Sequence, residues 1–87
     1  MGVSSDGRVR LVLPAAADYS RVARATAAVL GRREGFSVRE VNQLQLDVGE
    51  AIAGLVGDAV DGDRVEVVFT VEEGDVAFTT ALLGQPV

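Results

Sequence analysis

The hydrophobic period changes twice along this chain, and those changes limit the folds open to it. Alternation with a period of two, typical of half-buried strands, occurs over Arg8–Leu13, Arg64–Glu72 and Val76–Leu83. The first two of these segments are separated by a stretch with the 3.6-residue period of helices. The sequence Glu-Gly-Asp at residues 73–75 predicts a hairpin turn between the second and third of these strand segments. The expected element order is therefore β-α-α-β-β.

The first helix is expected to begin at Asp18, a plausible N-cap, and to run to about Arg33. Gly35 suits its C-terminal end, and Gly31 is the earlier alternative. Its expected buried stripe consists of six residues: Tyr19, Val22, Ala23, Thr26, Val29 and Leu30. The opposite side carries Arg21, Arg24, Ala28 and Arg32.

The second helix opens with the sequence Ser-Val-Arg-Glu at residues 37–40, which is a capping box. It is expected to run to roughly Val60, before a turn at residues 61–63. Its main apolar stripe consists of six residues: Val41, Leu44, Val48, Ile52, Leu55 and Ala59.

The economical packing of these elements is an α+β two-layer sandwich. Both helices cover one face of a three-stranded, mainly antiparallel sheet. The pattern leaves open which hairpin strand pairs with the first strand. Residues 1–7 are small and polar and are expected to be a loose tail, and residues 8–87 form one domain.

Composition argues against several functional classes. The 87 residues contain no cysteine, and no histidine occurs either, which excludes a disulfide framework, a Cys/His zinc site and a Ser-His-Asp triad. The net charge of −5 argues against direct binding to nucleic acid. The apolar runs are too short for a membrane span and no apolar signal region opens the chain, so a cytoplasmic protein without membrane contact is expected.

The second helix carries the candidate site. Asp47, Glu50, Gly54 and Asp58 form a ridge about 115° from the apolar stripe. Clustered carboxylates attract magnesium, whereas a solvated acidic face is the simpler alternative. Gly49, Ala53 and Gly57 form a second row of small side chains. This row either packs closely against the first helix or admits a ligand or a partner chain.

Four sequence features together resemble one known family. The first two are a strand ending in Leu13-Pro14 and an arginine-bearing helix closing on Gly35-Phe36. The third is the segment Ser-Val-Arg-Glu at residues 37–40 leading into Leu-Gln-Leu-Asp-Val-Gly-Glu-Ala at residues 44–51, and the fourth is the valine-rich hairpin that follows. This arrangement is similar to the N-terminal half of the anti-sigma-factor serine kinases, in the histidine-kinase/Hsp90-like (Bergerat-fold) ATPase superfamily. The resemblance covers residues 9–80 and implies a truncated Bergerat-like fold.

The resemblance also implies a degenerate nucleotide site. Glu50 matches the glutamate that orients or activates the phosphate acceptor in the family, and Asp58 stands where an acid is compatible. Gly54 replaces the asparagine that holds magnesium. No Asp-x-Gly-x-Gly adenine turn follows the hairpin. We therefore expect no catalytic residue and no cofactor.

The expected function is that of a non-catalytic, anti-sigma-like regulator that binds a sigma factor or an antagonist protein. An open sheet edge predicts a homodimer or a hetero-complex. Arg21, Arg24 and Arg32 form a candidate contact for an acidic partner, or else a solvated helix face. One alternative is a minimal serine kinase that binds Mg-ATP, with Glu50 as base and help from Asp47 or Asp58. A scaffold domain without such a task is another.

Overall fold

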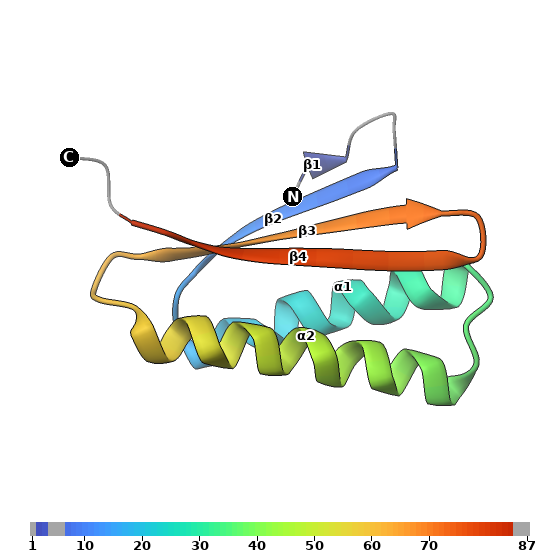
Figure 1. Ribbon diagram of the computed structural model, residues 1–87, viewed down its shortest axis with the longest axis horizontal. Helices are drawn as coiled ribbons and strands as arrows, with labels where there is room; N and C mark the ends of the chain where they lie inside the picture. Colours follow the sequence, from blue (N-terminus) through green and yellow to red (C-terminus); the bar gives the residue numbers. More distant parts are fainter. Residues whose placement is uncertain (1, 4–6, 85–87) are drawn as a thin grey trace.

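Two helices lie against one face of an antiparallel sheet, as Figure 1 shows. The computed structural model describes residues 2–3 and 7–84. The elements, in chain order, are β1 Gly2–Val3, β2 Arg8–Pro14, a 3-10 turn at Ala17–Tyr19, α1 Ser20–Arg33, α2 Val38–Asp58, β3 Arg64–Glu72 and β4 Asp75–Leu83. The predicted order of long elements and the α+β class are confirmed.

The strand order β1-β2-β3-β4 shows how the first long strand joins the hairpin. β2 pairs with β3, and Leu11 lies opposite Val67, which in turn lies opposite Thr80 of β4. The short strand β1 pairs with β2 and was not expected from the sequence. The predicted loose tail otherwise falls on residue 1 and residues 4–6, which lie outside the described residues, and on Gly7.

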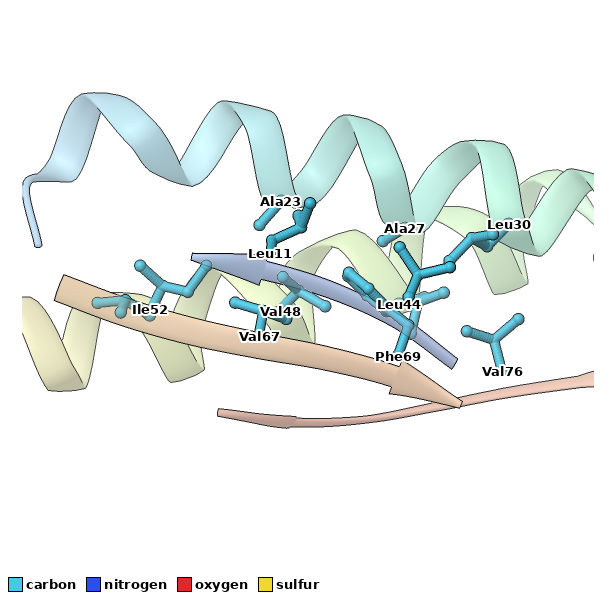
Figure 2. Close-up of a cluster of buried hydrophobic side chains, with 12 residues drawn as sticks. Leu11, Ala23, Ala27, Leu30, Leu44, Val48, Ile52, Val67, Phe69 and Val76 are labelled. Atoms are coloured by element: carbon cyan, nitrogen blue, oxygen red, sulfur yellow. The ribbon is translucent and has the colours of Figure 1, made fainter. Parts of the chain in front are cut away.

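The core lies between the sheet and the helix pair (Figure 2). The alternation predicted for β3 is confirmed, because Val65, Val67 and Phe69 are almost completely buried. The Phe69 ring packs against Phe78 of β4 with 6.4 Å between ring centroids. On the opposite face of the sheet, which no described helix covers, Arg10 Nε donates to Glu66 Oε2 at 2.5 Å.

The start of α1 differs from the prediction at Asp18. This residue lies inside the 3-10 turn, and no side chain caps the helix that follows. An N-cap residue needs extended backbone, whereas Tyr19, at the N-cap position, has helical angles of φ −79° and ψ −9°. The 3-10 turn therefore displaces the capping position and leaves Asp18 exposed.

The buried side of α1 is also rotated from the predicted stripe. Val22 and Val29 are 44% and 54% exposed, whereas Ala28, predicted to lie on the opposite side, is 3% exposed. Small residues allow α2 to approach this side closely: a Cβ at Gly31 would lie 3.5 Å from Cγ2 of Val41 on α2. The buried surface is therefore shared between the sheet and α2, and it is not centred on the larger side chains.

The connection between the helices follows the sequence signals. Gly35 has φ +85°, a left-handed conformation that suits the residue after a helix C-terminus. The capping box is confirmed: Glu40 N donates to Ser37 Oγ at 3.1 Å, and Ser37 N donates to Glu40 Oε1 at 2.9 Å. The hydrogen bond from the Ser37 backbone, followed by the bond with its hydroxyl, lowers the pKa of Glu40 below its ordinary value of 4.5.

The apolar stripe of α2 is confirmed, with Val41, Leu44, Val48 and Ile52 buried. The helix ends at Asp58, two residues before the predicted end. Over residues 2–3 and 7–84, neither helix combines the length and the apolar character that crossing a membrane requires.

Candidate functional site

The outer side of the helix pair contains an open groove of about 510 Å³. Its lining comes from α1 and α2 only: Ser20, Arg24, Asn42, Gln45, Leu46, Gly49, Glu50 and Ala53. We call this the interhelical groove. It brings together two residues that the sequence had placed in separate candidate sites, Arg24 and Glu50.

Arg24 extends from α1 across the interhelical groove to α2. Its side chain is half-buried and crosses Gly49, where Arg24 Cδ lies 3.2 Å from the position that a Cβ would take. Gln45 Nε2 donates to the Arg24 carbonyl oxygen at 3.1 Å and ties the two helices together at the same level. Gly49 is therefore small because an arginine side chain lies over it.

The Arg24 Nε is buried and has no hydrogen-bond partner among the residues that the structure describes. A buried donor without an acceptor costs about 1–3 kcal/mol. Arginine offers only donors, so an oxygen acceptor or an anion is the chemistry that this position can take. Glu50 lines the same groove, yet no hydrogen bond or ion pair joins it to Arg24 within residues 7–84.

The predicted acidic ridge is divided in the structure. Glu50 lines the interhelical groove, whereas Asp47 and Asp58 are exposed outside it. Asp47 Oδ1 accepts a hydrogen bond from Gln43 Nε2 at 2.8 Å. A Cβ at Gly54 would meet nothing within 4 Å. In the described part of the chain, no three acidic side chains are grouped closely enough to hold a metal ion.

The row of small residues on α2 is explained only in part by packing. Gly49 and Ala53 line the interhelical groove, and Gly49 admits Arg24. Close packing is wrong as an explanation for Gly57, because a Cβ there would also meet nothing within 4 Å. This end of α2 faces open space on that side.

The three predicted contact arginines do not share one environment. Arg21 and Arg32 are exposed on α1 and do not line the interhelical groove, whereas Arg24 is half-buried within it. The polar lining residues Asn42 and Gln45 were missed by sequence reasoning. One signal could have located the groove: a long side chain on one helix lying against a glycine on the other. Recognising it requires the relative alignment of the two helices, which the sequence does not provide.

Comparison with known proteins does not identify a family for this chain. A scan with protein-family models finds no matching family, and a search of curated proteins finds no significant match.

Proposed function

We propose that this chain is a non-catalytic, anti-sigma-like regulatory domain that acts in the cytoplasm by binding another protein. The observation that carries the proposal is the buried, unpartnered Nε of Arg24 in the interhelical groove. An acidic side chain from a partner supplies the missing acceptor once the Arg24 side chain shifts, because the Nε itself is not accessible from the groove in this conformation. Charge-assisted hydrogen bonds of this kind are about twice as strong as neutral ones.

The surroundings of Arg24 favour a protein as the binding partner. Leu46 lines the same groove and is 53% exposed, so an apolar contact lies beside the guanidinium group. Arginine is enriched among the residues that dominate binding energy in protein interfaces, and neighbouring contacts around such residues exclude water. Glu50 adds a negative charge to the lining and restricts the direction from which an acidic group can approach.

The resemblance of residues 9–80 to the anti-sigma-factor serine kinases suggests which proteins to test. A sigma factor or an antagonist protein of that kind of regulatory system is the proposed partner. The binding mode we propose uses Arg24 and does not require nucleotide chemistry at Glu50.

The test is calorimetric titration of the chain against sigma factors and their antagonists. We expect one of them to bind, and Arg24→Gln to weaken that binding at least tenfold, about 1.4 kcal/mol. Arg21→Gln is the matched control, because Arg21 is an exposed arginine on the same helix outside the groove. Equal losses in the two variants would reject a specific role for the groove. Thermal unfolding of both variants shows that they remain folded.

Titration with Mg-ATP separates the proposal from the kinase alternative. We expect no heat of binding at millimolar nucleotide. Binding that is lost in Glu50→Gln would replace our proposal with the minimal kinase, because Glu50 is the residue that the resemblance assigns to that chemistry. Failure of every sigma factor and antagonist to bind would leave the scaffold alternative.

A further inference from the structure

The outer edge of β4 has no neighbouring strand among the described residues. Its nine residues pair with β3 in an unbroken register, from Asp75 opposite Glu72 to Leu83 opposite Arg64. From Val76 to Leu83 the strand contains no charged residue, no proline and no glycine. Proteins normally protect such edges with charges, proline or bulges. β4 therefore has the composition of a strand that is paired on both sides.

Away from the hairpin turn, the burial of the helix-facing side chains falls from β3 to β4, whereas Val76, next to the turn, is buried. Val65, Val67 and Phe69 on β3 are almost completely buried. Their cross-strand partners on β4 are Leu82, Thr80 and Phe78, and all three remain half-buried. The apolar layer against the helices is thus incompletely covered along the β4 edge from Phe78 to Leu82, where an additional strand would cover it.

We propose that β4 pairs antiparallel with β4 of a second copy of this chain, with the two-fold axis at Thr79. This proposal does not depend on the interhelical groove. Thr79 is the central residue of Asp75–Leu83, so this register pairs all nine residues. Ala77 then lies opposite the partner's Ala81, and Phe78 lies opposite the partner's Thr80. Seven consecutive cross-strand pairs are uncharged, and none places like charges opposite each other.

The charges near the two ends of β4 favour a second copy of this chain as the partner that pairs with its outer edge. The hairpin end carries Glu72, Glu73 and Asp75, whereas Arg64 lies beside Leu83 at the other end. Antiparallel pairing brings the acidic end of one copy to the Arg64 end of the other. Asp75 and the partner's Arg64 are then two strand spacings apart, roughly 10 Å. Their side chains are on the same face of the sheet and shorten that gap.

Two double variants of exposed residues test the register. In Ala77→Lys/Ala81→Lys, each lysine lies opposite a lysine of the second copy. In Ala77→Glu/Ala81→Lys, each pair has opposite charges. The two variants share the lysine at position 81, and they differ only in the sign of the charge at position 77. Both alanines are exposed on the face that the helices do not cover, so each monomer can fold.

Sedimentation velocity from about 1 μM to 1 mM measures the dimer dissociation constant. We expect the wild-type chain to dimerise, the Lys/Lys variant to have a dissociation constant at least about tenfold higher, and the Glu/Lys variant to stay within about threefold of wild type. A wild-type chain that is monomeric throughout this range overturns the proposal. Equal dimerisation of the two variants overturns it as well, because the interface would then lie elsewhere.

Hydrogen exchange on the wild-type chain provides a test that does not depend on any variant folding. We expect the outward-facing amides of β4 to exchange more slowly at concentrations above the dimer dissociation constant than below it. Exchange of the β4 amides that does not change with concentration would contradict the proposed interface.

Discussion

The side chain of Arg24 on α1 lies across Gly49 on α2, with Arg24 Cδ 3.2 Å from the position that a Cβ at residue 49 would occupy. This contact leaves no room for a larger side chain at residue 49 unless Arg24 moves. It also holds the unpartnered Arg24 Nε below the protein surface. The glycine therefore has a structural role, and the arginine that covers it has a binding role under our proposal.

Gly49→Leu should destabilise the fold, because the new side chain must displace Arg24 from the helix contact. Overpacking of this kind costs about 1–3 kcal/mol, against about 1 kcal/mol gained in helix propensity. Urea unfolding measures the net loss. Gly54→Leu is the control, since open space surrounds Gly54, and it should leave stability unchanged or raise it. A Gly49 variant as stable as the Gly54 variant would contradict the packing contact.

Ala28→Leu and Val29→Ala test which side of α1 is buried. Ala28 is 3% exposed, so a larger side chain there should cost about 1–3 kcal/mol. Val29 is 54% exposed, and its truncation should change stability by no more than about 0.5 kcal/mol. The melting temperatures of the two variants, compared with that of the wild-type chain, measure these changes in stability. The reverse order of stabilities would restore the stripe that the hydrophobic pattern predicts.

Ser37→Ala removes the hydroxyl that accepts the Glu40 backbone N–H at the start of α2. The loss should be about 1 kcal/mol, the usual cost of removing an N-cap side chain. Ser37→Asp retains an acceptor and should recover most of the loss. If both variants have the same midpoint of urea unfolding as the wild-type chain, the capping box does not stabilise the protein.

The Glu40 carboxylate should contribute to acid sensitivity. Its pKa is lower in the folded chain than the ordinary value of 4.5, because the hydrogen bonds with Ser37 favour the charged form. The contribution is therefore present above pH 4.5 and is lost as the pH falls through the lowered folded pKa. Glu40→Gln should flatten this part of the curve of unfolding free energy against pH. Parallel curves for wild type and variant would contradict this linkage.

Local signals predicted most of the fold. Alternation identified the buried positions of β3, and the Ser37–Glu40 pair located the start of α2, because both depend on residues close together in the chain. The burial of α1 was predicted poorly. The hydrophobic pattern predicts that the larger apolar residues Val22 and Val29 are buried. Close contact between helices instead depends on small residues such as Ala28, which is the one that is buried.

The candidate site was predicted as separate parts. Glu50 was identified from the helix ridge and Arg24 from the basic face, but the groove that contains both depends on how α1 and α2 are aligned. Pattern within one helix carries no information about that alignment. The unpartnered Nε of Arg24 could not be anticipated for the same reason, since it depends on what Gly49 and its neighbours place around the guanidinium group.

The pairing of β2 with β3 has a consequence for how the chain folds. Pro14 lies opposite Arg64, fifty positions later, whereas the two helices and the β3–β4 ribbon are each adjacent in sequence. Closing the longer loop costs more entropy than closing either local unit. We therefore expect β2 to dock last, onto a helix pair and a ribbon that are already in contact. Until it does, the β3 edge is as open to a foreign strand as the β4 edge.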